Sequence, residues 1–228
     1  MAKHGKRYRE IRSSAPTETL DMEAALTFLK QNPGASFDET VEMGLRMGLD
    51  PRKSDHAIRG TVNLPNGTGQ DIRVVVFAAG PAAEAASEAG ADEVGMEDLI
   101  EKVQGGWTDF DVAIATPDAM KEVRKLGRVL GPRGLMPNPK TGTVTDDTGT
   151  AVQQSKAGKV EFRMDRHGNI NVPIGKRSFE AQALKQNAQA LLAAIRAQRP
   201  ASAKGLFIKN CTVSTTMGVG LRVNVTRE

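Results

Sequence analysis

The sequence predicts a fold of class α/β plus α+β, with a doubly wound α/β unit in the middle of the chain and α+β segments on both sides. Three observations predict it. Apolar strand-like runs alternate with helix-forming stretches in the middle, strands with period-two alternation occur in both flanks, and a Pro/Gly-rich turn segment precedes the middle. With 228 residues, the chain can form one large domain or two modest ones.

The N-terminal flank contains two predicted strands. Residues 40–47 alternate in polarity with period two, which is typical of a strand with one solvent-facing side. Residues 60–64 form a second strand that we expect to pair with the first, and the turn-forming segment 65–69 follows as a linker.

The middle of the chain begins with a strand at residues 72–78, where a nearly continuous apolar run rich in β-branched side chains predicts burial on both faces. A helix over 82–89 follows and ends at Gly90. A short strand is predicted at 91–94, and residues 96–103 have the i, i+3, i+4, i+7 apolar spacing of a helix.

The next strand, at residues 110–115, is followed by Thr116-Pro117-Asp118, which opens a helix through about residue 125. Repeated β-α units of this length require parallel strand pairing and helices on both faces of the sheet. We therefore predict a compact doubly wound unit over roughly residues 71–155.

The C-terminal flank begins with strands at 159–163 and 170–174, which we expect to form a hairpin around the turn at 165–168. Ser178 is predicted to cap a helix whose apolar stripe runs from Leu184 to Ile195 and which Pro200 ends. Further strands are predicted in the remainder of the flank, at 207–213 and 221–225. Neither flank alone offers a sheet large enough to bury a helix well. One economical arrangement therefore folds both flanks into a single α+β domain with the middle unit inserted, and two separate small domains are the alternative.

The composition is that of an ordinary globular protein, with 25% charged and 39% hydrophobic residues. The single cysteine, Cys211, excludes an internal disulfide bond and fits a reducing compartment. No apolar run reaches the ~18 residues of a membrane-spanning helix, and the basic N-terminus has no apolar segment behind it. These features predict a soluble, cytoplasmic protein with no membrane association.

The net charge of +4 hides a strong asymmetry along the chain. Residues 71–118 are strongly acidic, whereas residues 119–140, residues 155–228 and the first dozen residues are basic. A basic C-terminal third together with a basic N-terminal arm predicts a surface for a polyanion, because neutralised phosphates supply most non-specific affinity for nucleic acids. Plain solubilising charge is the alternative.

Residues 134–141 approach the spacing of a phosphate-binding P-loop, with a proline in place of the second glycine. Pro137 and Pro139 have no N–H group to donate to a phosphate, and no Gly-x-Gly-x-x-Gly follows the first middle strand. Residues 127–142 are instead predicted to form a rigid, basic loop. An α/β nucleotide-binding enzyme is the competing hypothesis, and it predicts thermal stabilisation by ATP or NAD.

Catalytic and metal sites have little support in the sequence. The three histidines are far apart without ligand spacing, and Cys211 sits in an apolar strand pattern typical of a buried side chain. We therefore expect no catalytic residue, no metal and no cofactor, and a protein that is not an enzyme. Aromatic residues make up only 4%, so RNA recognition would depend on shape and on hydroxyl groups such as those of residues 214–216 rather than on base stacking. A β-edge and turn is the alternative interpretation of that segment.

Four motifs are recognisable together: Lys3-His-Gly-Lys-Arg-Tyr8, Phe37-Asp-Glu-Thr-Val-Glu42, Gly127 to Lys140 and Ser214-Thr-Thr-Met-Gly218. They resemble those of the bacterial ribosomal protein L-one family. The resemblance implies an RNA-binding α+β domain of residues 1–68 and 157–228, an inserted Rossmann-like α/β domain of residues 69–156, and a hinge between them. It also implies a ribosomal protein that binds large-subunit rRNA, forms the mobile stalk that helps deacylated tRNA leave the exit site, and represses translation by binding its own mRNA leader. We expect it to assemble into the ribosome and to be a monomer when free.

The same resemblance implies the site residues. The rRNA-binding residues would be Phe37, Thr40, Glu42, Arg163, Asp165, Arg166, Gly168, Ser214, Thr216, Met217 and Gly218. A possible tRNA or secondary RNA contact would involve Arg128, Arg133 and Lys140. The chain departs from the family pattern at Ser36, where many relatives have lysine, and at Asn210 and Thr212.

Overall fold

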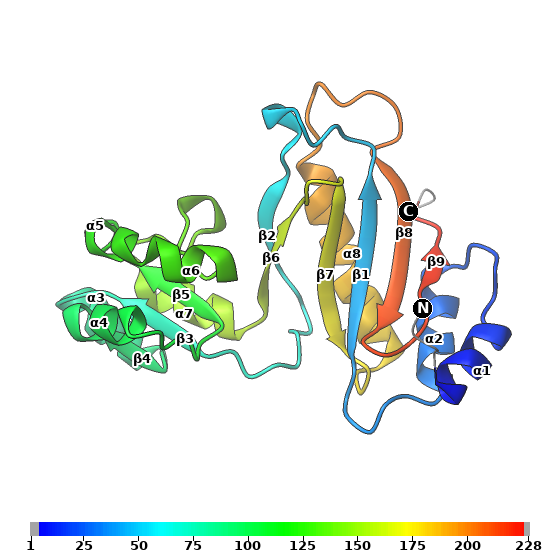
Figure 1. The fold of residues 1–228 in the computed structure, drawn as a ribbon, viewed down its shortest axis with the longest axis horizontal. Helices are drawn as coiled ribbons and strands as arrows, with labels where there is room; N and C mark the ends of the chain where they lie inside the picture. The colour runs from blue at the N-terminus through cyan, green and yellow to red at the C-terminus, as the bar shows by residue number, and fades with distance from the viewer. Residues whose placement is uncertain (1–4, 226–228) are drawn as a thin grey trace. The chain divides into compact units, whose positions relative to one another are not determined.

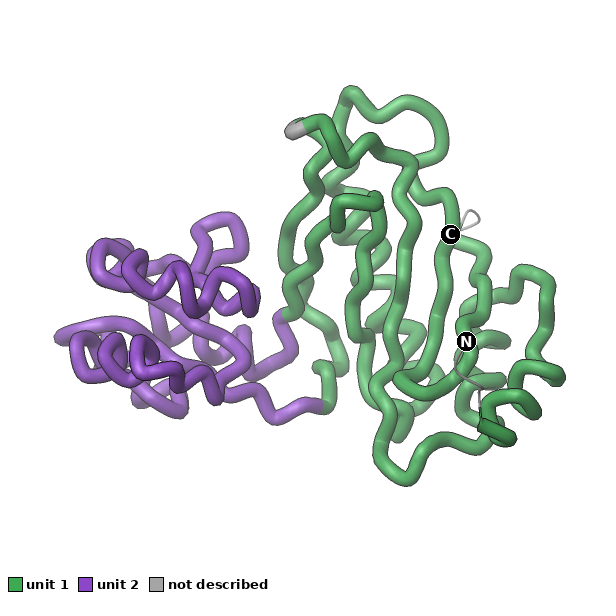
Figure 2. The backbone as a smooth tube through the Cα atoms, in the orientation of Figure 1, with its two compact units in different colours: residues 1–69, 160–228 green, residues 70–159 purple. Residues whose placement is uncertain are grey.

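The computed structural model describes residues 5–225, so Lys3 and His4 of the N-terminal motif lie outside the described residues. The chain divides into two compact units, residues 1–69 with 160–228 (unit 1) and residues 70–159 (unit 2), as Figure 2 shows. Both units combine helices with strands, which confirms a mixed α/β protein. In the described part of the chain, no helix is long and apolar enough to cross a membrane.

Unit 1 is built on an antiparallel four-stranded sheet with the strand order β7-β1-β8-β9 (Figure 1). Its strands are β1 (Thr40–Met47), β7 (Asn169–Lys176), β8 (Ile208–Thr215) and β9 (Leu221–Val223). The strand prediction for residues 40–47 is confirmed. Because β1 pairs with β7 on one side and β8 on the other, the two flanks of the chain form one sheet.

The helices α2 (Met22–Gln31) and α8 (Ala181–Ala197) cover one face of this sheet, and α8 lies behind it in Figure 1. The period-two pattern of β1 explains the packing, since Val41, Met43, Leu45 and Met47 are buried in the core and the residues between them point away. The short N-terminal helix α1 (Lys6–Ser14) adds Ile11 to the same core. The opposite face of the sheet is left to polar side chains.

The predicted hairpin and one predicted strand pair are wrong. Strands β2 (Arg59–Asn63) and β6 (Lys159–Arg163) form a separate two-stranded sheet, so β2 does not pair with β1 and β6 does not pair with β7. The Arg59 Nε atom donates to Glu161 Oε1 at 2.7 Å across this pair, and the turn at residues 165–168 only connects the two sheets. The η1 turn (Ser54–His56) lies between β1 and β2.

Ser178 does not cap α8. Helix α8 starts at Ala181 after Glu180, whereas the Ser178 hydroxyl donates to Asp38 Oδ2 at 2.6 Å and its N–H donates to Asp38 Oδ1 at 3.0 Å. The serine therefore ties the segment before α8 to the loop before β1, and the capping prediction is wrong because a tertiary partner takes the hydroxyl.

Unit 2 contains a parallel three-stranded sheet with the order β4-β3-β5, formed by β3 (Val74–Phe77), β4 (Glu93–Gly95) and β5 (Val112–Ala115). Alternate residues of β3 enter two different apolar clusters, with Val75 and Phe77 in one and Val74 and Val76 in the other. Helices α3 (Pro81–Glu88) and α7 (Thr148–Lys156) pack on one face, and α4 (Glu97–Gln104) packs on the other. This sheet is thus buried on both faces.

The predicted loop over residues 127–142 is partly wrong, because its first half is helical. The segment contains α6 (Gly127–Arg133) and η3 (Pro139–Thr141), and it directly follows α5 (Met120–Val123) and η2 (Arg124–Leu126). Leu126 and Leu130 are fully buried one turn apart, and their burial outweighs the low helix propensity of the glycines and Pro132. Gly134, with φ +74°, ends the helix in the left-handed conformation.

Candidate nucleic-acid interface

The uncovered face of the unit 1 sheet is a shallow polar groove, which we call the open face. Its polar lining residues come from β1, β7 and β8, and they are Glu42, Arg46, Asn169, Asn171, Asn210, Thr212 and Ser214. Hydroxyl and amide groups of this kind both donate and accept hydrogen bonds. Gly44 keeps the middle of the groove flat, since a Cβ atom there would lie 2.9 Å from Asn171 Oδ1.

Part of the open face was missed by sequence reasoning. Arg46 donates from Nη1 to Asn169 Oδ1 at 3.1 Å and lies on the same side of β1 as Glu42. The period-two pattern of β1 was a sufficient signal for Arg46, because residues two apart share a face. Asn169 and Asn171 had no such signal, since their position depends on the register between β7 and β1.

Two exposed apolar side chains, Phe37 and Met217, belong to the loops at one end of the open face, and each is 53% exposed. Hydrogen bonds between Thr40 and Thr216 join these loops. The Thr40 N–H donates to Thr216 Oγ1 at 3.1 Å, and the Thr216 N–H donates to the Thr40 carbonyl at 3.1 Å. Residues from opposite ends of the chain, which the sequence suggested as one site, therefore lie at the same edge of unit 1.

Glu39 holds these two loops together, and sequence reasoning missed it. The residue is 1% exposed, and its carboxylate accepts hydrogen bonds from the Ala35 N–H at 2.5 Å and the Met217 N–H at 3.1 Å. Burial alone would raise the pKa of Glu39, but hydrogen bonds from Thr215, Ala35 and Met217 and the charge of Arg177 together hold it below its usual value. The carboxylate is thus ionised and fixes the loops on either side.

Arg177 connects the same region to helix α2. Its Nη2 atom donates to the carbonyl of Lys30 at 3.1 Å and to that of Asn32, and its Nε atom donates to the carbonyl of Leu29 at 3.3 Å. The last carbonyl groups of a helix lack partners within the helix, and a guanidinium group is suited to bind several of them. The loop end of the open face is therefore anchored to the core of unit 1.

The contact between Glu39 and Thr215 requires a glycine at position 218, whether or not RNA is bound. A Cβ atom on Gly218 would lie 2.2 Å from Thr215 Oγ1, the hydroxyl that is hydrogen-bonded to Glu39. We expect Gly218→Ala to lower the free energy of unfolding by about 1–3 kcal/mol, measured by urea titration. In the control Gly131→Ala, no atom lies within 4 Å of the new Cβ, and stability should be unchanged or slightly higher. Equal stability of both variants would contradict this role of Gly218.

The turn at the other end of the open face contains Asp165 and Gly168. Asp165 Oδ1 accepts from the N–H groups of His167 at 2.8 Å and Asn169 at 2.7 Å. These bonds, led by that of Asn169, hold the pKa of Asp165 below its usual value. Gly168 adopts φ +79°, which favours glycine. The carboxylate thus organises the turn itself.

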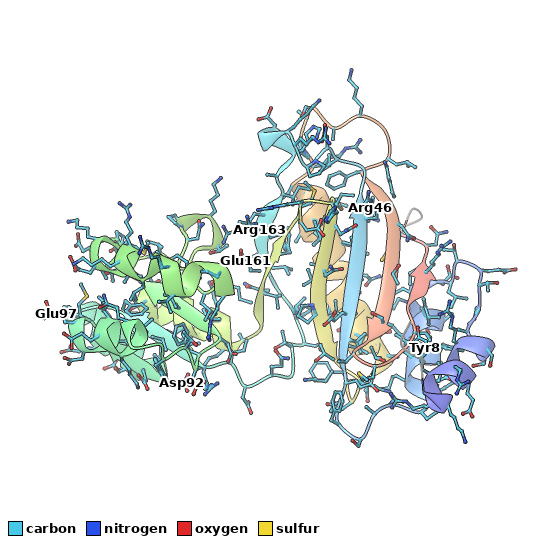
Figure 3. All side chains as sticks on the ribbon, in the orientation of Figure 1. Tyr8, Arg46, Asp92, Glu97, Glu161 and Arg163 are labelled. Atoms are coloured by element: carbon cyan, nitrogen blue, oxygen red, sulfur yellow. The ribbon has the colours of Figure 1, made fainter. Side chains whose placement is uncertain are left out.

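The arginines near this turn, Arg163 and Arg166, have exposed side chains. Arg163 ends β6 in the two-stranded sheet, and Figure 3 shows it and Arg46 toward the end of unit 1 away from Tyr8. Ser214 pairs with Glu42 in the β1–β8 register and lies in the groove. The proposed rRNA-binding residues therefore fall at both ends of the open face and along it, with Arg163 on the neighbouring sheet.

The remaining site residues, Arg128, Arg133 and Lys140, are exposed and belong to unit 2. The P-loop-like segment around Lys140 uses its own amides internally. The Lys140 N–H donates to Asn138 Oδ1 at 2.8 Å and the Thr141 N–H donates to the Asn138 carbonyl at 3.2 Å, so neither is open to a phosphate.

Other chemistry is sparse in the part of the chain that the structure describes. Residues 5–225 contain no group of three or more histidine, cysteine or acidic residues that could hold a metal ion. Cys211 is buried in β8, and burial raises the pKa of its thiol to about 12, which keeps it protonated and unreactive.

A family model and the relatives compared with this chain agree with one another. The sequence model of the "Ribosomal protein L1p/L10e family" matches residues 29–219. A protein of Protochlamydia amoebophila named "Large ribosomal subunit protein uL1" is 52% identical over 226 residues, which cover 99% of this chain and 96% of that protein. Proteins of the same name are 54% identical over 231 residues in Mycobacteroides abscessus and 52% identical over 229 residues in Chlamydia trachomatis serovar D. Each of these alignments covers 100% of this chain and 98% of the relative.

Proposed function

This chain belongs to the ribosomal protein L1p/L10e family, and on that premise we propose that it is a structural protein of the large ribosomal subunit that binds rRNA in the cytoplasm. The relatives, which match it over nearly their whole length, are named as large-subunit proteins. The observation that carries the proposal is the juxtaposition of Phe37, Thr40, Thr216 and Met217, from both ends of the chain, at one edge of the open face.

The rRNA-binding surface combines apolar contacts with hydrogen bonding. Phe37 and Met217 pack against sugars or bases, and the hydroxyls of the open face bond to ribose 2′-hydroxyl groups. Glu42 accepts hydrogen bonds from 2′-hydroxyls or base amino groups, because a carboxylate repels phosphate. Asp165 and Gly168 present a rigid turn at the far end, and Arg163 and Arg166 bind phosphates.

Unit 2 is an inserted Rossmann-like domain in this proposal. Its parallel sheet with helices on both faces supports that description, and the chain passes between the units only near residues 69–70 and 159–160. Two single-chain crossings are suited to a hinge. The protein then forms the mobile stalk that assists release of deacylated tRNA from the exit site, with Arg128, Arg133 and Lys140 as a secondary RNA contact.

The same surface binds a leader in the protein's own mRNA, and this binding represses translation. One arrangement of hydroxyl and apolar groups can recognise the rRNA and the mRNA leader if the two RNAs have the same shape. The free protein is a monomer and needs no cofactor. The proposal does not include an enzymatic role. The alternative, an α/β nucleotide-binding enzyme, depended on the fold of the α/β unit, and a fold alone does not imply catalysis.

The test is a filter-binding series with the full chain at matched salt. The RNAs are a stalk fragment of large-subunit rRNA, the mRNA leader and an unrelated duplex of equal length. We expect the rRNA fragment to bind most tightly, the leader next and the duplex at least 10³-fold more weakly, the ~10³–10⁷ range of specific recognition. Equal affinity for all three RNAs would disprove specific recognition. Co-sedimentation with large subunits through high salt is expected, and ATP or NAD should leave the melting temperature unchanged.

A further inference from the structure

Within residues 5–225, helix α1 carries positive charges that have no ion-pair partner. Lys6, Arg9 and Arg12 are exposed, and among the described residues none of their side chains has a hydrogen-bond or ion-pair partner. Some other cations of unit 1 have a partner, such as Lys185 with Glu23 at 2.9 Å. The helix contains a single acidic residue, Glu10. Three cations without a partner among the described residues therefore lie on one nine-residue element.

Lys6 and Arg9 also oppose the helix dipole, whereas Arg12 lies in the last turn, where a cation is favourable. The first turn of α1 contains no acidic residue but includes Lys6, Arg7 and Arg9, next to the positive end of the dipole. Cations at a helix N-terminus lower helix stability, whereas an anion bound there raises it. Negative charge bound at the N-terminus of α1 from outside the chain would therefore stabilise the helix.

Helix α1 is nevertheless held firmly beside the Met217 loop. Ile11 is 5% exposed, belongs to the unit 1 core and lines one small cavity together with Glu39 and Gly218. On the flank of the helix, Arg7 Nη2 lies 3.5 Å from the carbonyl oxygen of Met217, at the outer limit of a hydrogen bond. Figure 1 shows α1 on the β9 side of the sheet. The cations therefore adjoin the loop end of the open face.

We propose that α1 is a second RNA-contact surface, which binds backbone phosphates through Lys6, Arg9 and Arg12 where the RNA leaves the Met217 end of the open face. This inference rests on the proposed rRNA binding. A lipid headgroup offers phosphates too, but the apolar residues of α1 face the protein core, so no apolar side is left to enter a bilayer. Continuity with the open face favours RNA.

The experiment compares the full chain with the triple variant Lys6→Gln, Arg9→Gln, Arg12→Gln. The matched control is Lys121→Gln, Arg124→Gln, Lys125→Gln, which removes the same charge from exposed positions of unit 2. The probes are the stalk rRNA fragment and a scrambled duplex of equal length, each titrated between 0.05 and 0.3 M salt, taken as about the range in which phosphate contacts are most visible. Vesicles with anionic lipid form a separate arm.

We expect the triple variant to bind the rRNA fragment on the order of 10- to 100-fold more weakly at 0.15 M salt, with a slope of log K against log salt reduced by about 2. The scrambled duplex should lose a similar factor, because phosphate contacts carry no sequence information. The melting temperature should change little, since Lys6 and Arg9 oppose the dipole whereas Arg12 in the last turn favours it. The control should change affinity less than about threefold.

The outcomes separate this inference from the proposed function. If the unaltered protein fails to bind the rRNA fragment specifically, the proposed function itself is wrong. If it binds and the triple variant has the same affinity and salt slope, only the inference about α1 is overturned. Loss of affinity with a large drop in melting temperature, or loss of vesicle binding with unchanged RNA affinity, would also overturn it.

Discussion

Replacing Met217 with aspartate is expected to weaken binding of the rRNA fragment by about 100-fold or more. The variant removes one of the two large apolar side chains exposed at the loop end of the open face. It also puts a carboxylate where phosphates approach, close to the ionised Glu39 that accepts from the Met217 N–H. Exposed apolar residues at the centre of an interface commonly contribute ~2–4 kcal/mol, which corresponds to this range. Filter binding at fixed salt measures it.

The matched control is Leu206→Asp, because Leu206 is 65% exposed and precedes β8, whereas Met217 follows it. Both variants exchange an exposed apolar side chain for a carboxylate, and both should fold. We expect the Leu206 variant to change affinity less than about threefold. A similar loss in both would mean that added negative charge, and not the Met217 contact, causes the effect. Thr216→Val is a less selective probe, since the Thr216 hydroxyl bonds to the Thr40 backbone within the protein.

Replacing Glu39 with alanine is expected to lower the free energy of unfolding by about 3 kcal/mol. The substitution leaves the Ala35 and Met217 N–H groups without an acceptor and removes the charge opposite Arg177. Glu39→Gln keeps the size and one acceptor oxygen, so it should lose about half as much. Urea unfolding followed by circular dichroism measures the loss.

Trp107 provides an internal reference, because it is the only tryptophan and lies in unit 2. Its fluorescence transition should stay where it is in the unaltered protein, while the transition of unit 1 moves to lower urea. An equal shift of both transitions would contradict a local role for Glu39 at the open face.

Glu39 also makes stability depend on pH in a defined direction. Its pKa in the folded protein lies below the usual value of 4.5, so the unfolded chain binds more protons in that range. The stabilisation is complete above pH 4.5 and is lost as pH falls through the lower, folded-state pKa. We expect the unaltered protein to lose stability below pH 4.5 more steeply than Glu39→Gln, measured by thermal melts between about pH 3 and 7. Parallel curves would show that Glu39 does not contribute.

The local sequence pattern predicted secondary-structure elements well where buried and exposed residues alternate along the chain. Strand β1 was predicted with its observed bounds, because period-two alternation marks both ends of a half-buried strand. Strand partners were predicted poorly. The β2–β6 pair and the separation of β6 from β7 depend on which side chains meet across the fold, and nothing in either segment alone contains that information.

In the candidate site too, some residues were predictable from the sequence and others depend on tertiary contacts. Phe37, Thr216 and Met217 were found through family motifs, whereas the sequence gives no sign that Glu39, among other acidic residues, is buried between two loops. The helix over Gly127–Arg133 was missed because its two glycines and one proline predict a loop, although Leu126 and Leu130 are buried. In both cases, tertiary burial overrode what the local composition indicates.

The central position of β1 between two C-terminal strands has a consequence for synthesis of the protein. Unit 2 is continuous in sequence, whereas β1 has no neighbour until β7 (Asn169–Lys176) has been translated and lacks its second neighbour until β8 (Ile208–Thr215) has followed. The surface made by its outer residues therefore does not exist on an unfinished nascent chain. If the open face binds RNA as proposed, a chain that ends before β8 lacks this binding surface.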